Sequence, residues 1–495
     1  MSIHNLKIYN TFSRKKEKIK PIKGKNRLNL FVCGPTVYDF PHIGHARTYI
    51  FFDSFVKYLK EIGFNVFYLQ NITDLDDKII ARAREKHVLP KCLAEAFEKE
   101  YLKAMKKLHI NSVTKYARAT SYIKEIINQT ERLLEKGYAY KLEDGIYYDI
   151  SKFKNYGKLS GRTALAAEDA VSRIDYSRDK RNRGDFCLWK FKQEETEPSW
   201  NSPFGSPPTN FDVNAKSKGK NNLKLVGGKG RPGWHIEDTA IAEKFFGTQY
   251  DIHGGARDLI FPHHEAEISQ MEAISDKKPF VRYWMHTGFL TVNGQKMSKS
   301  IGNFITIDDF LKRNSYQQLR FLILKNQWHS PLDYSESIMI EVRTSLEKIE
   351  EFLRKISNVK ITKTTNKAIS QKLKKTGKDF YKELDNDFNT PRAFAVIFDF
   401  IKEANRFLEN NLVSKKQAID IYNFFQKVNK IFEIIDFKKT KKIVIPSEIK
   451  KLMKDREKER NKQNWQRADG IRTEIEKMGY LVEDTKTGQA IKQKN

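Results

Sequence analysis

The sequence predicts an α/β protein with a parallel sheet near its start, followed by helical domains and a small C-terminal module. Residues 28–34 form an apolar run ending in glycine, which is typical of a buried strand that enters a turn. An apolar helical pattern starts near His42, and a second strand pattern covers residues 66–71. Strand, helix and strand in such a span indicate a parallel βαβ unit, and beyond residue 307 the pattern is almost entirely helical.

The elements after this unit follow from local patterns. In chain order we expect helices over residues 85–136, a mixed segment over 137–186 with a short strand at 146–150, a proline-rich loop over 198–233, and strands near 250–253 and 283–290. A polar linker at residues 359–366 precedes a helical domain that extends to about residue 437.

Composition limits the class of protein. The chain has 495 residues, enough for several domains with buried cores, and its three cysteines are too few for a disulfide scaffold. No apolar run reaches transmembrane length, and the first residues lack the apolar stretch of a signal peptide. We therefore expect a cytoplasmic protein with reduced cysteines and no membrane association.

The formal net charge of +29 favours a polyanionic partner such as RNA, because lysine and arginine neutralise phosphate groups. A general lysine bias of the source proteome would give the same excess. The clustered basic residues at 437–460, followed by Trp465, strengthen the RNA interpretation. A solvated helix face is the alternative for that run.

The motif HIGH at residues 42–45 indicates a site for a triphosphate. It opens a helix directly after a strand and a turn, where free backbone amides attract anions. His42 and His45 share a helix face and can donate hydrogen bonds to phosphate oxygens, while Gly44 lets an adenine ring approach the backbone. His42 by itself would be interpreted as an ordinary loop histidine.

A second motif, KMSKS at residues 296–300, supports the same interpretation. It places Lys296 and Lys299 close together on a loop with small residues between them. Their ammonium groups suit the charge that develops on a leaving pyrophosphate. The two motifs in this order, with a strand before the first, indicate a nucleotide site.

Three side chains of zinc-ligand types occur near these motifs. Cys33 ends the first strand, and His263 and Glu267 are four residues apart, so a helix would present both on one side. A buried small cysteine and an exposed helix contact are the alternatives. The spacing alone leaves both interpretations open.

Longer segments make the chain similar to the cysteinyl-tRNA synthetases, a family of class I aminoacyl-tRNA synthetases. The segments that carry the resemblance are FVCGPTVYDFPHIGHAR (31–47), NITDLDDKI (71–79), GRPGWHIE (230–237), IHGGARDLIFPHHEAEISQ (252–270), GQKMSKSIGNF (294–304), SPLDYS (330–335), DFNTPRA (387–393) and NWQRADGIR (464–472). They are long and spread over the chain, so the resemblance is highly specific.

The resemblance implies a domain plan. A Rossmann-like catalytic domain would cover residues 1–305, with a connective insertion at about 115–230 that includes a loop insert at 206–228. It would be followed by a stem-contact helical region (306–365), a helical-bundle anticodon-side domain (366–437) and a small C-terminal anticodon-binding module (438–495).

The resemblance also implies a ligase. It would convert L-cysteine and ATP to cysteinyl-adenylate and pyrophosphate, and then transfer cysteine to the 3′ end of tRNA-Cys. ATP would bind together with Mg²⁺. The residues expected to contact it are His42, Gly44, His45, Gly254, Gly255, Asp258, Lys296 and Lys299. The amino-acid pocket would be lined by Cys33, Thr73, Asp74, Trp234 and His263, with an ordinary core tryptophan as the alternative for Trp234. We expect a monomer.

The family binds one zinc ion through two cysteines, a histidine and a glutamate, and the substrate thiol completes the shell. Cys33, His263 and Glu267 match three of these positions, but Asp238 stands where the family has its second cysteine. Either Asp238 ligates zinc in a harder, less thiophilic site, or the site is weak or metal-free. A bound zinc would separate a thiol from a serine hydroxyl without a second editing site.

The loop insert and the C-terminal module carry further expectations. We expect the insert at 206–228 to be a poorly ordered excursion into solvent, the alternative being an RNA contact through Lys216, Lys218, Lys220 and Lys224. In the C-terminal module, the residues on a helical pattern that suit unstacked bases are Arg460, Asn464, Trp465, Asp469 and Arg472. A packed helical cap with a core tryptophan is the alternative there.

Two other functions stay open at this point. A cysteine ligase acting on a small amine such as a sugar amine is one, although residues 440–495 argue against it because such relatives lack an anticodon domain. A catalytically silent RNA-binding paralogue is the other. Asp238 is its only support, and the intact HIGH and KMSKS motifs oppose it.

Overall fold

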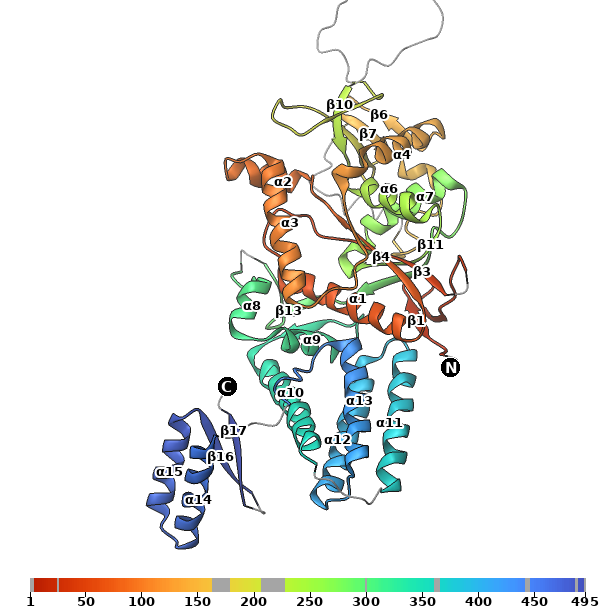
Figure 1. The fold of residues 1–495 in the computed structure, drawn as a ribbon. Coiled ribbons are helices and arrows are strands. Elements are labelled where there is room, and N and C mark those ends of the chain that lie inside the picture. Colours follow the sequence, from red (N-terminus) through yellow and green to blue (C-terminus); the bar gives the residue numbers. More distant parts are fainter. Residues whose placement is uncertain are drawn as a thin grey trace, which may run out of the picture.

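The computed structural model describes residues 4–24, 26–162, 179–205, 228–298, 301–359, 366–440, 446–485 and 488–493. Figure 1 shows a domain of sheets and helices above a bundle of long helices, with the C-terminal module beside the bundle. Within the described ranges, no helix combines the length and the apolar character that crossing a bilayer requires.

A five-stranded parallel sheet forms the centre of the upper domain. In spatial order its strands are β12 (Val281–Thr287), β11 (Tyr250–Ala256), β3 (Arg27–Val32), β4 (Asn65–Ile72) and β5 (Lys115–Arg118). The predicted βαβ unit is confirmed, since α1 (Ile43–Glu61) connects β3 to the parallel strand β4. The chain leaves β3 toward β4 and returns on its other side as β11, so the strand order reverses at β3. Ligands of such sheets bind beyond the carboxyl ends of the strands at this reversal.

The segment over residues 85–136 is mostly helical, as predicted, but it contains a strand. The helix α2 (Asp77–Glu85) ends where the segment begins, and its own helices are α3 (Pro90–Lys107), the short η1 (Ala119–Tyr122) and α4 (Ile123–Glu135). The expectation of helices alone is wrong at β5, which pairs in parallel with the end of β4. Four residues at a sheet edge are too few to show a strand period, and their partner lies far back in the chain.

A second, antiparallel sheet is formed by strands between residues 139 and 232. Its order is β6 (Ala139–Lys141), β7 (Gly145–Tyr148), β8 (Phe186–Phe191), β10 (Gly228–Pro232) and β9 (Trp200–Ser202), and η2 (Ile150–Lys152) follows β7. The expectation of a loop over 198–233 is therefore wrong at both ends. A Cβ at Gly230 would lie 2.3 Å from Trp189 Nε1, so the glycine serves a close approach of strands rather than a loop. The predicted excursion at 206–228 lies outside the described residues except for Gly228.

Two helices from the later part of the chain pack beside the central sheet. α6 (Trp234–Phe246) follows β10, and α7 (His263–Ser275) follows β11 and η4 (Arg257–Ile260). Both are buried on nearly all sides. The helix predicted to carry His263 and Glu267 is confirmed, and it begins at His263 itself.

Short strands join the sheet domain to its surroundings. The hairpin β1 (Lys7–Asn10) and β2 (Lys15–Lys18) lies beside β12, and the small sheet near residue 290 contains β13 (Leu290–Val292), β14 (Gln295–Lys296) and β15 (Leu332–Tyr334). β15 breaks the almost entirely helical pattern expected beyond residue 307.

The bundle below consists of α10 (Glu336–Ser357), α11 (Lys367–Asp385), α12 (Thr390–Glu409) and α13 (Lys415–Phe432), and α8 (Ile307–Arg313) and α9 (Tyr316–Leu324) connect it to the sheet domain. Amphipathic spacing buries one face of each long helix, and the buried faces form a phenylalanine-rich core.

Two buried arginines bind α1 to the start of the bundle. Arg47 on α1 donates to the backbone oxygens of Ile323, Gln327, Trp328 and Ser330. Arg320 on α9 lies 2.8 Å from Asp53 on α1 and donates to Phe432 O at the end of α13. Burial alone would raise the pKa of Asp53, but Arg320 and Lys57 outweigh it, and this pKa lies below its usual value.

The C-terminal module contains α14 (Ser447–Asn461), α15 (Trp465–Lys477), β16 (Tyr480–Thr485) and β17 (Gly488–Gln493). The last two strands pair antiparallel and correct the helical expectation for the end of the chain. A small core of Ile449, Ile475 and Val482 holds the helices against the hairpin.

Candidate active site

The carboxyl ends of β3 and β4 meet beside β11, and the loops there carry the predicted site residues. The turn after β3 is tight, because a Cβ at Gly34 would lie 1.7 Å from Asn71 O and only glycine fits. The Cys33 amide donates to Gly254 O at 3.0 Å. Cys33 is therefore held between the two strands at which the chain order reverses.

His42 is the N-cap of α1, and its ring forms a pair with His45. The His42 Nδ1 accepts from the Gly44 amide at 3.1 Å, and the His45 Nδ1 accepts from the His42 amide at 3.3 Å. Each contact requires an unprotonated Nδ1, so each neutral ring carries its proton on Nε2. The rings stack with centroids 3.9 Å apart, and burial, followed by the nearby His42, lowers the pKa of His45 well below its usual value.

The KMSKS segment lies against this pair. A Cβ at Gly44 would come within 2.8 Å of the His42 ring and 3.3 Å of Met297 Cε, so glycine is required where the two motifs meet. Lys296 is exposed on β14, and Lys299 lies outside the described residues.

Backbone hydrogen bonds fix the residues after KMSKS to the HIGH loop. The Ile43 amide donates to Ile305 O at 3.1 Å, and the Ile307 amide donates to Pro41 O at 2.9 Å. The two motifs, far apart in the sequence, are thus joined by main-chain contacts before any nucleotide is bound.

The residues predicted to bind adenosine lie at the end of β11 and in η4. A Cβ at Gly254 would lie 2.2 Å from the Phe52 ring, and one at Gly255 would lie 2.9 Å from His264 Cε1. Packing against these rings is therefore sufficient to require both glycines. Asp258 is exposed in η4.

The structure brings together the four predicted metal ligands. Ligand atoms of Cys33, Asp238, His263 and Glu267 all lie within 4.8 Å of one another, and all four residues are buried. The His263 Nε2 lies 3.1 Å from Asp238 Oδ2 and 3.2 Å from Glu267 Oε1. Both carboxylate oxygens of Glu267 lack a hydrogen-bond partner within the described part of the chain. One thiolate, one imidazole and two carboxylates at this separation fit a divalent cation.

Two histidines that the sequence reasoning missed belong to the same cluster. His253 on β11 and His264 on α7 form a second possible ligand set with Cys33 and Glu267, again within 4.8 Å. The Cys33 Sγ lies 3.2 Å from His253 Nε2 and 3.1 Å from His264 Nε2. The opposite nitrogen of His264 contacts His286 Nε2 at 2.7 Å. The doubled histidine in PHHEAE and the histidine in IHGG were the signals available.

Burial dominates the electrostatics of this cluster. It raises the pKa of the Cys33 thiol well above its usual value, and the carboxylates of Asp238 and Glu267 add to the effect. Burial likewise raises the pKa of Glu267 and lowers that of His264. A divalent cation favours the thiolate and the carboxylate, so it would oppose the shifts of Cys33 and Glu267, and it binds the neutral form of histidine that burial already favours.

Trp234 and Thr73 lie next to the cluster. The Trp234 ring stacks on His263 with centroids 4.1 Å apart and is 37% exposed, so it is a surface wall rather than a core residue. Thr73 Oγ1 donates to Glu237 Oε2 at 3.1 Å, directly beside Asp238. Asp74 is bound by Thr120 through the backbone amide and the hydroxyl, so its side chain holds η1 in place.

In the C-terminal module, Arg460 lies over the Trp465 ring at 5.6 Å, and Trp465 is 55% exposed. Trp465 is therefore not a core residue. Asn464 contacts Glu459, and Arg472 pairs with Glu476 along α15. Asp469 accepts from Thr473 through its backbone oxygen, one turn along the same helix.

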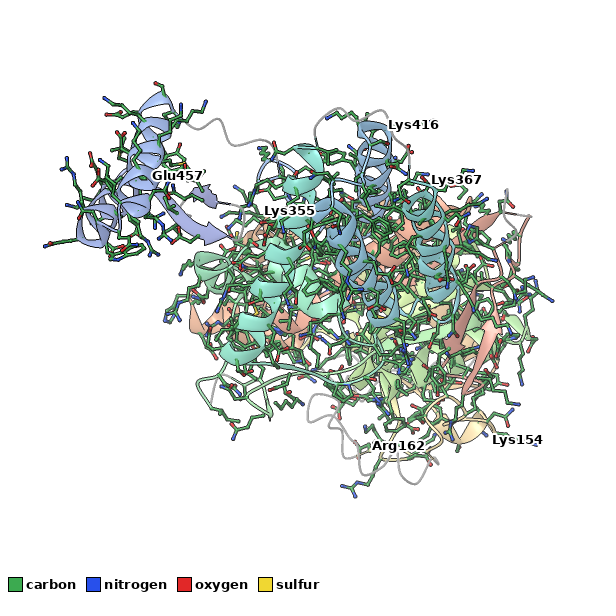
Figure 2. All side chains as sticks on the ribbon, turned by 90° about the horizontal axis from the view of Figure 1, so that it is seen from below. Lys154, Arg162, Lys355, Lys367, Lys416 and Glu457 are labelled. Carbon is green, nitrogen blue, oxygen red and sulfur yellow. The ribbon has the colours of Figure 1, made fainter. Side chains whose placement is uncertain are left out.

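Basic side chains are not confined to this module. Figure 2 labels Lys154 and Arg162 on the sheet domain and Lys355, Lys367 and Lys416 on the bundle, and all five are exposed. The net charge of +29 is therefore distributed over several parts of the surface.

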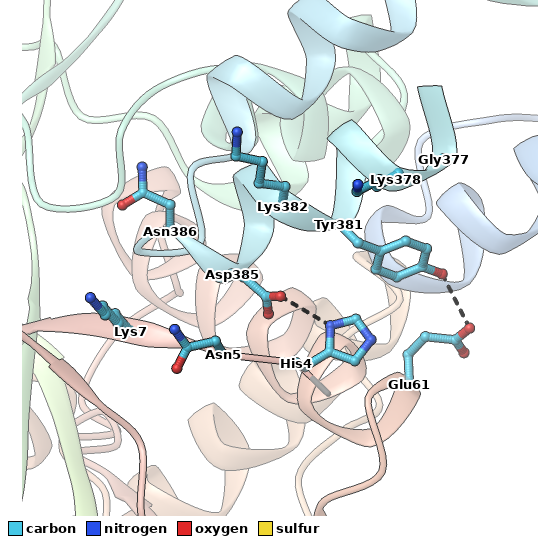
Figure 3. A pocket seen from close by; sticks show the side chains of 10 residues that line it. All are labelled: His4, Asn5, Lys7, Glu61, Gly377, Lys378, Tyr381, Lys382, Asp385 and Asn386. Carbon is cyan, nitrogen blue, oxygen red and sulfur yellow. Dashed lines mark hydrogen bonds and ion pairs between the residues drawn. The ribbon is translucent and has the colours of Figure 1, made fainter. Parts of the chain in front are cut away.

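A separate pocket of about 750 Å³ lies where the N-terminal segment meets the end of α1 and α11 (Figure 3). His4 Nδ1 contacts Asp385 at 3.1 Å, and Tyr381 donates to Glu61 at 3.3 Å. The described residues that line it include none of the predicted site residues, so it is distinct from the cluster around Cys33.

Comparisons with known families cover nearly the whole chain. The family described as "tRNA synthetases class I (C) catalytic domain" matches residues 18–217 and 208–344. The DALR domain matches residues 379–436, and the "Cysteinyl-tRNA ligase anticodon binding domain" matches residues 444–491.

Curated relatives align over their full length. A cysteine--tRNA ligase of Methanococcus maripaludis is 40% identical over 506 residues, covering 99% of this chain and all of that protein. One of Thermoplasma acidophilum is 41% identical over 480 residues, covering 97% of this chain and 98% of the relative.

A solved structure supports the fold. Mycobacterium tuberculosis methionyl-tRNA synthetase in complex with methionyl-adenylate superposes with a TM-score of 0.60 over 82% of this chain and 92% of that chain. The sequences are 14% identical, so this likeness concerns the fold alone.

Proposed function

The chain belongs to the cysteine--tRNA ligase family, and from this premise we propose how its residues perform the reaction. The enzyme joins L-cysteine to ATP, forming cysteinyl-adenylate and pyrophosphate, and then transfers cysteine to the 3′ end of tRNA-Cys. The relatives' identity of about 40% over the full chain is the observation that carries this conclusion.

At the phosphate end, His42 and His45 donate hydrogen bonds from Nε2 to the phosphate oxygens of ATP, which enters with Mg²⁺. Because both rings are neutral, they orient the phosphates without trapping the product by charge. Lys296 and Lys299 supply the charge for the pyrophosphate as the cysteine carboxylate attacks the α-phosphate. Gly44, Gly254, Gly255 and Asp258 surround the adenosine. No covalent enzyme intermediate is required.

At the thiol end, Cys33, Asp238, His263 and Glu267 hold one zinc ion. Their mutual distances, their burial and the two Glu267 oxygens, which lie near histidine rings but lack a hydrogen bond, support this assignment. When bound, zinc lowers the pKa of the substrate thiol and prefers its thiolate to a serine hydroxyl. Trp234 closes the side of the pocket next to His263, and Thr73 lines its floor.

Asp238 makes this site harder than a site with two cysteines. An aspartate oxygen replaces one soft ligand, so we expect weaker zinc retention and a greater tolerance for Co²⁺. His253 and His264, which also contact Cys33, give the ion a second set of ligands within the same cluster. A site of this composition does not depend on a second cysteine.

tRNA-Cys is the proposed macromolecular partner. The exposed Trp465 beneath Arg460 suits an unstacked base, because an aromatic ring and a guanidinium both stack on bases. The basic residues of the bundle in Figure 2 suit the phosphates of the stem between the two ends of the tRNA. We expect the enzyme to act as a monomer.

The two other functions are less well supported. A ligase that acts on a small amine has no use for the module that matches an anticodon-binding domain at residues 444–491. A silent paralogue has no need of the joined HIGH and KMSKS segments.

One experiment separates the three functions. The purified protein is assayed for cysteine-dependent ATP–pyrophosphate exchange, and then for charging of a tRNA-Cys transcript. We expect both activities. Exchange without charging would favour the small-amine ligase, and the absence of exchange with cysteine would leave the silent paralogue.

A further inference from the structure

Glu237 is a buried carboxylate whose hydrogen bonding is incomplete. It lies on α6 with none of its surface exposed, and its Oε2 accepts from Thr73 Oγ1 at 3.1 Å. Its Oε1 is buried and has no hydrogen-bond partner among the described residues. An unpartnered buried acceptor costs stability, and a buried carboxylate costs more. A donor that arrives with the substrate would remove this cost.

The titratable groups around Glu237 are acidic. Asp238 follows it in the chain, and Asp74 and Asp76 lie close enough to interact with it electrostatically. Asp74 is already bound by Thr120, and Asp76 caps α2 through the Lys78 amide. Within the described ranges, no lysine, arginine or histidine forms an ion pair with Glu237. A cationic donor beside the unpartnered Oε1 would therefore be surrounded by acidic side chains.

The position of Glu237 relative to the metal cluster suggests which cation. Asp238, its neighbour on α6, belongs to the cluster, and Thr73, its hydrogen-bond partner, is the first residue after β4. In cysteine the thiol and the ammonium are carried by adjacent carbon atoms. A thiol directed at Cys33 and Asp238 must therefore bring its ammonium close to the residues that flank the cluster. Glu237 flanks it and offers an unused oxygen.

We propose that Glu237 binds the α-ammonium group of the substrate, through Oε1, while Thr73 holds the other oxygen in place. This inference rests on the proposed function, since it assumes that an amino acid with a thiol occupies the pocket. Glu237 then makes the site selective for a β-aminothiol. The metal cluster recognises the sulfur, and Glu237 recognises the nitrogen, so a thiol without an ammonium group loses one of two charged contacts.

Two thiols that each lack one group of cysteine test the proposal on the zinc-loaded enzyme. Cysteamine keeps the ammonium and lacks the carboxylate, whereas 3-mercaptopropionate keeps the carboxylate and lacks the ammonium. For Glu237→Gln we expect the KM for cysteine to rise by about 10- to 100-fold, the range for a hydrogen bond to a charged group. Inhibition of exchange by cysteamine should weaken by a similar factor, and inhibition by 3-mercaptopropionate should not weaken.

Metal content and matched variants keep the interpretation specific. Glu237→Gln should retain as much zinc as the wild type, and Glu237→Asp should recover part of the cysteamine binding. Glu272→Gln is the control, because Glu272 is also a buried glutamate but contacts Lys158 and the Phe280 amide, away from the pocket. It should leave the preference between the two thiols unchanged.

The outcome that overturns the proposal is an equal loss of affinity for both thiols, or an unchanged KM for cysteine. If Glu237→Gln does not fold, the wild type decides, since cysteamine must raise its melting temperature more than 3-mercaptopropionate does. Equal shifts would overturn the proposal as well. Failure of the proposed function looks different: the wild type would show no exchange with cysteine, whichever thiol it preferred.

Discussion

The two ends of the active site are built in different ways. At the phosphate end, HIGH and the residues after KMSKS are joined by backbone hydrogen bonds, and each histidine of the pair has a defined tautomer. At the thiol end, buried acids, histidines and a cysteine from distant segments lie within a few ångströms, with their pKa values shifted against the charged forms. The described contacts of the phosphate end form without a ligand, whereas the thiol end has the composition of a site that a cation completes.

Removal of Cys33 tests this difference most severely, because Cys33 belongs to both possible ligand sets. Cys33→Ala should lose its zinc and reduce cysteine-dependent exchange on the order of 1,000-fold, since a bound metal contributes several kcal/mol. Metal analysis and exchange kinetics are the measurements. Cys92→Ser is the control, as Cys92 is exposed. A variant that is metal-free and fully active would contradict the role of the metal in selecting cysteine.

Replacement of His45 should disable the phosphate end and leave the thiol end intact. In His45→Asn the amide oxygen can accept from the His42 amide, as Nδ1 does, but the Nε2 donor is lost. We expect exchange to fall by about 100-fold, as for loss of one donor to a developing charge. The zinc content and the affinity for cysteamine should not change. A parallel loss of zinc would mean that the two ends are not independent.

Asp238→Cys should strengthen zinc binding at the thiol end. The variant restores a second soft ligand, so zinc should be lost about 10-fold more slowly to a chelator, at the lower end of the effects seen for metal-site residues. The preference for zinc over Co²⁺ should increase. Chelator competition followed over time measures both. No change in retention would indicate that the ion is held by His253 and His264 instead of Asp238 and His263.

The smallest expected effect concerns pH: between pH 8 and 6 the KM for ATP should not change. Burial and His42 lower the pKa of His45, so this ring stays neutral as the pH falls from 8 to 6, and the KM for ATP should remain flat if His45 governs it. The effect of pH on stability is opposite to that of a histidine in an ion pair, which stabilises the fold at low pH. The unfolded state takes up a proton below a pH of about 6.5, so the contribution of His45 to stability declines there. A KM for ATP that rises steeply below pH 7 would contradict a neutral ring.

The outcome for the site residues shows what sequence patterns can predict. His263 and Glu267 were paired by helical spacing, and Cys33 was placed by the strand before it, because both arguments use only local geometry. His264 was missed because the four-residue spacing that pairs His263 with Glu267 does not include it, and consecutive helical residues point in different directions. His253 was missed because its proximity to Cys33 depends on the pairing of β11 with β3, which no local pattern encodes.

The same limit applies to the fold. The buried strands β3 and β4 follow from short apolar stretches, and the long amphipathic helices follow from their helical period. The strands β5, β9 and β10 could not be predicted in this way, because each is short and forms only by pairing with a neighbouring strand. Gly230 illustrates the reason: a glycine that allows two strands to approach looks, in sequence, like a glycine that ends them.

The helix α1 carries the pair of histidines proposed to bind phosphate at its start, and Arg47 and Asp53 further along. The two side chains are anchored in carbonyl groups and in Arg320 at the top of the bundle. The helix therefore fixes the positions of the His42 and His45 rings relative to the first residues of the bundle.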